Sequence, residues 1–515
     1  MWFLYDNVAP VAVALAVSAV TWLFGGARGD LLVPVVPWIL ALLVEVLVCF
    51  PQRHRGESTY AARARVWERL RSSPIVLISG GLFLLLAIPF LNTGLCPGCD
   101  ADLIARGADP GPFFAFLPFC VDRIDHLHIT LVIAMALVSA IVVRYSLTHA
   151  GKRLVLTLVV WNGVALALFG FVQAVLDAPG PFWTPIFGVE RVPKGAFFSV
   201  FGYPNMAGDY FTLLFGISVA LWHRRCAEQD KQERAMDPSE RDAHRSRCND
   251  RLLRRHYLLL PAFVFFFATI QTLSRAAMIL VTVTAFVYFA HTLTAVMHQL
   301  SRSRRVYVGA WSIGLFLLLV ILVSVFTPKD VQREIGTLDS LTVLDRVSGR
   351  GQYHGDVAMA LWRDHPLFGC GGWGYKHLSV QKMEQMEIPR SKVQQTGGAN
   401  VHNDYLQFLA EHGLIGFGAL AAVAVFLLLP IVRQWRLLVR TVRFEKGERR
   451  RYPRPVQIFV LPAPVFFLMV ACLATLIHAF GDCPLRASSI LTLFYVVIAA
   501  LPGFMPPPRS ARAGS

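Results

Sequence analysis

The sequence predicts an all-α integral membrane protein with about twelve transmembrane helices and a large outer-face loop domain between spans nine and ten. Its 515 residues are 55% hydrophobic and only 16% charged, with a mean hydropathy of +0.51. An ordinary soluble domain carries about 25% charged residues. The apolar residues also gather in runs long enough to cross a bilayer. Together these observations exclude a water-soluble enzyme.

Twelve apolar runs have the length of a transmembrane helix, roughly 17–25 residues. They cover residues 8–24, 31–50, 75–91, 129–145, 154–175, 206–222, 258–273, 278–296, 308–326, 413–432, 456–480 and 489–505. Only Ser274–Ala277 separates the seventh run from the eighth. The segment Met1–Asn7 holds no Lys or Arg. It therefore lacks the basic start of a signal peptide, and we expect the first span to be retained.

The basic residues alternate with the spans. Of the 49 Lys and Arg residues, 33 lie in segments that share one side of the predicted topology: 51–74, 144–153, 223–257, 297–307, 433–455 and the tail from 506. The positive-inside rule places this side, with both termini, on the cytoplasmic face of the membrane. The net charge of +16 then needs no nucleic acid. The chain divides into spans one to nine (1–326), the outer loop (327–412) and spans ten to twelve with a basic tail (413–515).

The outer loop at 92–128 contains two patterns that can bind metals. A pair of cysteines with two downstream histidines favours either zinc or, in an oxidising compartment, a structural disulfide. Two carboxylates one residue apart could hold a divalent cation on a diphosphate, or could simply be solvated. The first pattern consists of Cys96, Cys99, His126 and His128, with Cys120 as a further candidate for a disulfide, and the second of Asp100 and Asp102. Neither pattern is specific, and we predict no metal site.

The large loop has nine basic and ten acidic residues, a balance typical of a segment that folds. We expect helices over residues 354–363 and 401–411. Near the second helix, Asn400 or Asn403 can act as the N-cap. His402 would lie at this helix N-terminus, where added positive charge is disfavoured and an anion is welcome. His402 is therefore a candidate proton acceptor.

The spacing around His402 resembles a family signature. His402 and Asn403, followed by nine residues, Gly413 and Gly416, match the His-[Asn/Ser/Gln]-x9-Gly-x-x-[Gly/Thr/Tyr] pattern of the O-antigen ligase family, which also includes Wzy-type polymerases and O-linked oligosaccharyltransferases. Four more segments resemble this family in the same order: Phe201–Gly208, Thr272–Ala277, Asp364–Gly371 and Ile477–Leu485. Two features depart from the pattern. His354 stands where members commonly have Trp after an Arg such as Arg350, and the first 150 residues match no motif.

The resemblance implies a GT-C-like membrane glycosyltransferase. Such an enzyme takes a glycan from a polyprenyl (undecaprenyl) diphosphate carrier at the outer face, without cofactor or metal, and inverts the anomeric carbon. It implies that His402 takes the acceptor proton. Arginines hold the diphosphate through bidentate, charge-assisted hydrogen bonds. Catalytic candidates are His402, Arg350 and Arg191; substrate-binding candidates are Arg275, Arg346, Asn403, Tyr405 and Asn205.

The acceptor stays open at this stage. O-antigen ligation to a lipid A-core hydroxyl is favoured, and polysaccharide polymerisation or transfer to a protein hydroxyl are the alternatives. A secondary transporter is a different class with the same number of spans. It predicts ionisable groups near the middle of the membrane and an internal repeat. The predicted spans contain only Glu45 and Asp209 as acids, both near an end, and no repeat is visible.

Overall fold

The structure is a computed structural model, and it describes residues 2–54, 56–94, 114, 116–184, 195–236, 256–297, 309, 314, 353–388, 400–445 and 461–505. This described part is helical. Its only β-type pairings are two isolated bridges, Thr93 with Cys120 and Phe198 with Phe201. The all-α class predicted from the sequence is therefore confirmed.

Apart from Thr59–Arg71 and Gly374–Gln385, the longer helices coincide with the predicted spans. They are α1 (Trp2–Trp22), α2 (Gly29–Cys49), α3 (Thr59–Arg71), α4 (Pro74–Ala87), α6 (Arg123–Ile141), α7 (His149–Val175), α8 (Pro204–Ala235), α11 (Leu259–Gln271), α12 (Arg275–Met297), α16 (Gly374–Gln385), α18 (Asp404–Glu445), α19 (Ala463–His478) and α20 (Ser488–Ala500). Short turns of helix are η1 (Phe24–Gly26), η2 (Ile88–Phe90), η3 (Val142–Ser146, a π-turn), η4 (Pro181–Trp183), η5 (Pro484–Arg486) and η6 (Leu501–Phe504). Of the predicted span 308–326, only positions 309 and 314 are described.

Five described helices are long and apolar enough to cross a membrane alone: Gly29–Cys49, Arg123–Ser146, His149–Val175, Arg275–Met297 and Asp404–Arg436. A sixth candidate is the pair Thr59–Arg71 and Pro74–Phe90, which is bent by 64°. Three further helices are apolar but shorter. The chain is therefore a multi-pass membrane protein, and the total of twelve spans stays a prediction.

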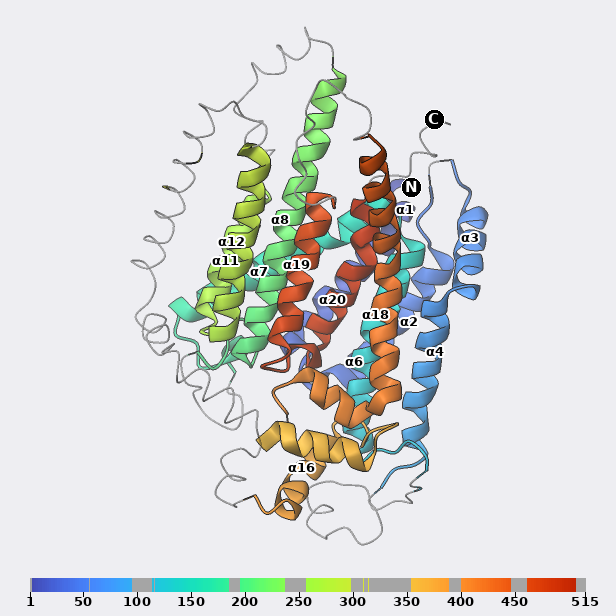
Figure 1. Cartoon of the computed structure of the whole chain (residues 1–515), viewed down its shortest axis with the longest axis vertical. Helices are drawn as coiled ribbons and strands as arrows, with labels where there is room; N and C mark the ends of the chain where they lie inside the picture. Colours follow the sequence, from blue (N-terminus) through green and yellow to red (C-terminus); the bar gives the residue numbers. More distant parts are fainter. Residues whose placement is uncertain are drawn as a thin grey trace.

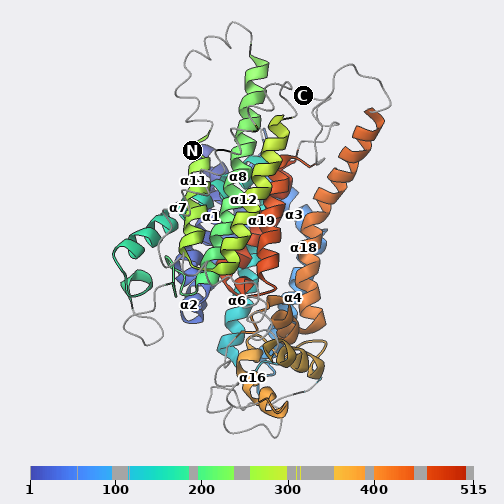
Figure 2. The ribbon, with the colours of Figure 1, turned by 60° about the vertical axis from the view of Figure 1, so that its left-hand side comes forward.

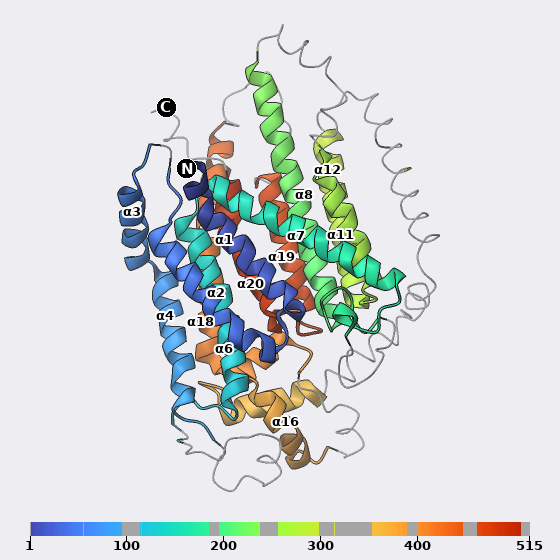
Figure 3. The ribbon, with the colours of Figure 1, turned by 180° about the vertical axis from the view of Figure 1, so that it is seen from behind.

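Helix α20 forms the centre of the bundle. Every residue of Ser488–Ala500 is buried, which fits a helix that is apolar on all sides. It packs against α6 and α1, while α8 packs along α19 and α11 (Figures 1 and 3). Residues 206–221 of α8 are buried without interruption. These central helices fix the positions of the turns at their ends.

The two ends of the bundle differ. The start of α1, helix α3 and the C-terminal ends of α8 and α18 lie at one end, and α16 lies at the other (Figure 1). Near the first of these ends, α18 leans away from α8 and α12 (Figure 2). The outer-loop segments that the structure describes therefore gather at the end away from the start of α1. We call the end with the start of α1 the terminal end and the other the loop end.

Helix α3 was not expected, because residues 51–74 were predicted to be a loop. The Ser58 side chain caps its start by accepting a hydrogen bond from Ala61 N–H at 3.2 Å. Its apolar residues are too few to form a run, so hydropathy does not reveal it. Arg69 and Arg71 fall in its last turn, where the helix dipole favours positive charge.

Candidate active site

His402 stands immediately before the capped start of α18. Asn403 is the N-cap, because its Oδ1 accepts a hydrogen bond from Leu406 N–H at 3.1 Å. Of the two residues predicted as possible N-caps, Asn400 and Asn403, the structure therefore shows Asn403 in this role. His402 itself has a φ of +56°, in the left-handed region that non-glycine residues adopt infrequently. Such conformations persist where the surrounding structure fixes them, and they cluster at functional sites.

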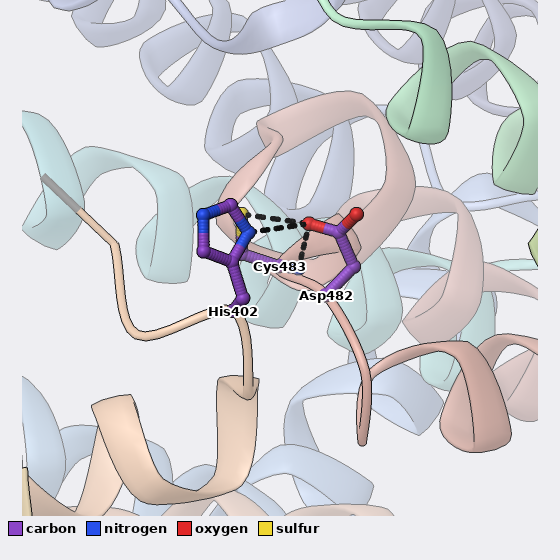
Figure 4. Close-up of side chains that lie close together, drawn as sticks. All are labelled: His402, Asp482 and Cys483. Carbon is purple, nitrogen blue, oxygen red and sulfur yellow. Dashed lines mark hydrogen bonds and ion pairs between the residues drawn. The ribbon is translucent and has the colours of Figure 1, made fainter. Parts of the chain in front are cut away.

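The His402 imidazole faces the turn between α19 and α20. Its Nδ1 lies 3.4 Å from Oδ1 of Asp482 (Figure 4). Asp482 Oδ1 also accepts the backbone N–H of Cys483 at 2.8 Å and the Cys483 thiol at 3.4 Å. The His402 side chain is 34% exposed and that of Asp482 only 6%. One ring nitrogen is therefore directed at a buried carboxylate, while the residue as a whole remains accessible to a substrate.

Two residues at the start of α8, its N-cap Tyr203 and Asn205 in its first turn, complete the surroundings of Asp482. The Tyr203 hydroxyl lies 2.9 Å from Oδ2 and 3.1 Å from Oδ1 of Asp482. The Asn205 side-chain amide donates to Oδ2 as well and to the Tyr203 hydroxyl at 3.0 Å. Asn205 was predicted to bind substrate, and in the structure its amide holds the carboxylate. The segment Phe201–Gly208 thus supplies partners for Asp482.

Asp482 is held as a carboxylate. Burial alone would raise its pKa, but the hydrogen bond to His402 and the charge of His478 lower it to about 2, with help from Cys483 N–H. Burial and the Asp482 charge raise the pKa of Tyr203, so its phenol stays a donor. A charged carboxylate on Nδ1 fixes the orientation of an imidazole and stabilises its protonated form. This arrangement suits His402 as a general base acting through Nε2.

A second histidine lies beside His402. The ring centroids of His354 and His402 are 6.2 Å apart, and His354 Nδ1 lies 2.7 Å from the Tyr375 hydroxyl. Burial, followed by the charge of His402, lowers the pKa of His354 to about 4. His354 is therefore neutral at pH 7. It belongs to the helical segment 353–364, which matches the helix expected over 354–363.

A further His–Asp pair lies deeper in the bundle. His478 Nδ1 is 3.1 Å from Asp209 Oδ1, and both side chains are almost completely buried. The pair joins α19 to α8, and the His478 carbonyl accepts the backbone N–H of Asp482 at 3.1 Å. Asp209 and His478 therefore anchor the turn that carries Asp482.

The signature glycines have a packing role. Helix α18 breaks at Gly413, whose φ of +61° and ψ of −171° favour glycine. At this break, the N–H groups of Leu414 and Ile415 donate to the carbonyls of Pro366 and Leu367 at 3.0 and 3.1 Å. A Cβ on Gly413 would collide with the Leu367 carbonyl. The Asp364–Gly371 motif thus docks onto the break in α18.

A buried ion pair ties these segments to the Asp482 turn. Arg486 Nη1 lies 2.6 Å from Glu411 Oε2, and neither side chain is more than 1% exposed. The Arg486 guanidinium also lies 4.2 Å from the centroid of the Trp373 ring. The pair connects the first turns of α18 with η5, and so supports both residues of the His402–Asp482 pair.

The Thr272–Ala277 motif forms the break between α11 and α12. Ser274 Oγ accepts the N–H of Ala277 at 3.3 Å, and Arg275 is the first residue of α12. Gly208 of α8 packs on Ala277 so closely that a Cβ there would collide. Two family-like motifs therefore meet at this turn, which also carries the partly buried Arg275.

The structure does not bring every predicted site residue together. Arg191, Arg346 and Arg350 lie outside the described residues, as do Cys96, Cys99, Asp100 and Asp102. The Tyr405 hydroxyl donates to the carbonyl of Leu476 at 2.7 Å, which anchors α18 on α19. Asn403 is engaged as the N-cap. The side chains of Tyr405 and Asn403 therefore already have hydrogen-bond partners within the protein.

Among the described residues, two clusters have the composition of a metal site, and one of them contains His402. One ligand atom each from His402, Asp482 and Cys483 lies within 4.8 Å of the others. Burial raises the pKa of the Cys483 thiol well above its usual value, so it remains a donor and not a thiolate ligand. Asp482 Oδ1 already accepts from Cys483 and Tyr203. These donors fit a positioned carboxylate better than a metal centre.

The zinc interpretation loses one of its histidines. Both ring nitrogens of His126 are engaged with backbone: Nε2 lies 2.9 Å from the Leu86 carbonyl, and Nδ1 accepts Gly372 N–H at 3.0 Å. His128 stacks on Trp373, with ring centroids 5.7 Å apart. His126 therefore has a packing role, joining α6 to the large loop.

Asp482, Tyr203 and His354 are the functional candidates that sequence reasoning did not assign. Asp482 and Tyr203 lie inside motifs that resemble the family, and His354 was noted only as a departure from the pattern. A motif shows which segments matter, but not which of their side chains meet across 80 or more positions. That pairing is a property of the tertiary structure.

Comparison with known proteins agrees with the motifs. The family model described as O-antigen ligase matches residues 260–421 of the chain. The matched segment includes Arg275, His354, His402, Gly413 and Gly416. A search of curated proteins finds no match. The match confirms the resemblance predicted from the motifs.

Proposed function

We propose that this member of the O-antigen ligase family transfers a glycan from a polyprenyl diphosphate carrier to an acceptor hydroxyl at the outer face of a bacterial plasma membrane. The observation that carries the proposal is the pair of an accessible His402 and a buried Asp482 carboxylate, 3.4 Å apart. It supplies an oriented base at the loop end of a membrane bundle. Both termini are then cytoplasmic.

In the proposed reaction, Nε2 of His402 takes the proton of the acceptor hydroxyl. The hydroxyl oxygen forms a bond to the anomeric carbon as the bond from that carbon to the diphosphate oxygen breaks. Asp482 stabilises the imidazolium that results. In-line displacement inverts the anomeric configuration. His402 passes the proton to water after the lipid diphosphate has departed.

The leaving group carries at least two negative charges and needs cationic partners. Arg191, Arg350 and Arg346, with Arg275 at the start of α12, are the proposed partners. A guanidinium binds phosphate oxygens in a bidentate fork and stays charged near lipid. The proposal uses no metal and no cofactor.

An apolar cavity supports a lipid-linked donor. It has a volume of about 560 Å³ and lies between α18, α19 and α20. Asp404 and Tyr405, two and three positions after His402, line one part of it, and Leu428, Leu461 and Leu501 line another. A cavity of this size and lining accepts an isoprenoid chain better than a sugar. The polar donor head would then lie near His402.

The acceptor is proposed at the level of a hydroxyl group. Lipid A-core is the favoured acceptor for an O-antigen ligase, and a growing glycan or a protein Ser or Thr are the alternatives. Each of these places its hydroxyl at the same base. The acceptor therefore does not affect the roles given to His402 and Asp482.

The test is glycan transfer by membranes that contain His402→Ala at matched protein level. A general base contributes about 10²–10⁴-fold, so transfer should fall by that factor. Binding of the lipid-linked donor should remain, because the arginines hold its diphosphate. His365→Ala is the matched control: its ring packs edge-on against Phe119 with centroids 4.9 Å apart, and it should transfer normally. Near wild-type transfer by His402→Ala would remove the base from the mechanism.

A further inference from the structure

A second cavity lies at the terminal end of the bundle, on the side predicted to be cytoplasmic. It has a volume of about 350 Å³. Unlike the apolar cavity beside α18, it is lined by basic side chains: His54, Arg69, Arg144, His149 and Lys152. The cavity belongs to neither the His402 site nor its motifs. We call it the basic cavity.

Separate elements direct the three strong bases toward the same space. Arg69 comes from the last turn of α3, Arg144 from the π-turn η3, and Lys152 from the first turn of α7. π-helical turns are rare in proteins, and many of those that occur lie at functional sites. Convergence of cations from three elements brings like charges together, which is unfavourable without a counter-ion.

Lys152 is the most informative member of the group. It is only 5% exposed, and its stem packs against Gly503, where an added Cβ would lie 3.2 Å from Lys152 Cβ. The neighbouring charges that act on it are Arg144 and Arg69, both positive. Among the described residues, no carboxylate forms an ion pair with any of these three cations. A basic loop placed by the positive-inside rule would be solvated, whereas an ammonium group buried among cations calls for an anion.

The local backbone also favours an anion. Thr148 caps α7, accepting a hydrogen bond from Gly151 N–H at 3.2 Å. The N-terminus of a helix attracts negative charge, yet the first turn of α7 has no acidic residue. His149 and Lys152 stand there instead. A bound anion would interact favourably with both the helix end and the cations. It would also explain why the first turn of α7 has basic residues where a helix favours acidic ones.

We propose that the basic cavity binds a phosphate-bearing anion on Lys152, Arg144 and Arg69. The phosphate could belong to the headgroup of an anionic phospholipid or to a soluble molecule, and the chemistry of recognition is the same. Helix α3, which carries Arg69, exposes Tyr60 (84%) and Trp67 (59%). Aromatic and basic residues on one short helix are typical of a membrane surface.

The experiment uses the full-length protein, delipidated in detergent. Native mass spectrometry measures retention of dioleoylphosphatidylglycerol against dioleoylphosphatidylcholine, and thermal unfolding measures the response to inorganic phosphate and pyrophosphate. A lipid source predicts selective retention of phosphatidylglycerol. A soluble source predicts stabilisation by phosphate or pyrophosphate. Lys152→Met and Arg144→Gln should each lower the affinity for the anion that the wild type binds by about tenfold or more. This is the scale of one charge-assisted hydrogen bond.

Arg71→Gln is the matched control, because Arg71 is an exposed base on the same helix as Arg69 that does not line the cavity. It should bind like the wild type. A second readout separates binding from folding: without ligand, Lys152→Met should unfold at a higher temperature than the wild type, and added ligand should close this difference. The proposal is overturned by a wild type that binds neither class of anion better than Lys152→Met, or by an equal loss of binding in Arg71→Gln.

Discussion

Nδ1 of His402 and Oδ1 of Asp482 lie 3.4 Å apart although 80 positions of chain separate the two residues. The Asp482 carboxylate is in turn held by Tyr203, Asn205 and Cys483. The imidazole is thus oriented by a buried group that is itself held by the start of α8 and by the next residue of its own turn. Catalytic bases need such support, because their geometry must hold within a fraction of an ångström.

The first prediction concerns Asp482→Asn. The amide keeps the volume of the carboxylate but removes its charge, and it can offer the imidazole the wrong hydrogen-bond partner. We expect kcat for glycan transfer to fall about 100-fold or more, within the range for loss of general-base function. The KM for the lipid-linked donor should stay within about twofold, because Asp482 does not bind the diphosphate. A steady-state assay in detergent separates the two constants.

Asp364→Asn is the control for this prediction. Asp364 pairs with Lys382 at 2.6 Å on the surface of the large loop, with 46% of its side chain exposed. Its removal should leave kcat unchanged, since exposed ion pairs contribute little. An Asp482→Asn enzyme with normal kcat would show that His402 needs no carboxylate partner.

The second prediction concerns the arginines proposed to bind the diphosphate. Arg191→Ala, Arg350→Ala and Arg275→Ala should each raise the donor KM more than they lower kcat. Lysine at these positions should restore little, because a point charge cannot reproduce the bidentate fork. Arg363→Ala, at an exposed arginine of the large loop, is the control. Full rescue by lysine would indicate simple charge attraction in place of the fork.

The third prediction concerns metal. The Cys483 thiol is protonated and Asp482 already accepts several donors, so transfer should continue in EDTA. Asp100→Ala combined with Asp102→Ala should also retain activity. The measurement is the transfer rate before and after chelation. Loss in EDTA that Mg²⁺ or Mn²⁺ restores would replace the arginine-based mechanism with a metal-based one.

Sequence reasoning found the apolar helices because a membrane span is a local property of composition and length. Helix α3 was not predicted, because its Arg-rich sequence has no apolar run and only the Ser58 cap indicates where it begins. The motifs located His402 and the glycines, and Gly413 proved to be a docking point for the Asp364–Gly371 motif. The partners of His402 could not be assigned, because Asp482 meets it only when α18 and α19 are packed.

The fourth prediction concerns the Glu411–Arg486 pair. Both side chains are almost fully buried, so removal of one partner leaves an uncompensated charge. Glu411→Ala or Arg486→Met should each lower the free energy of unfolding by about 3–5 kcal/mol. The double variant Glu411→Leu with Arg486→Met should recover much of this loss, because no isolated charge remains. Thermal unfolding in detergent compares the variants. A double variant that is less stable than either single one would show that an uncompensated charge does not cause the loss in the single variants.

The fifth prediction concerns acid stability and His354. This side chain is 3% exposed, and burial and the nearby His402 charge lower its pKa from 6.5 to about 4. Between these two values the unfolded chain binds more protons at this position than the folded protein. Stability must therefore fall as the pH is lowered through this window.

His354→Gln can keep a hydrogen bond to Tyr375 but cannot titrate in this pH range. Its unfolding midpoint should drop less than that of the wild type between pH 7 and pH 5. Tyr375→Phe removes the hydrogen bond and keeps the histidine, so it should retain a clear acid-induced drop. Equal drops in the wild type and His354→Gln would mean that other groups govern acid stability.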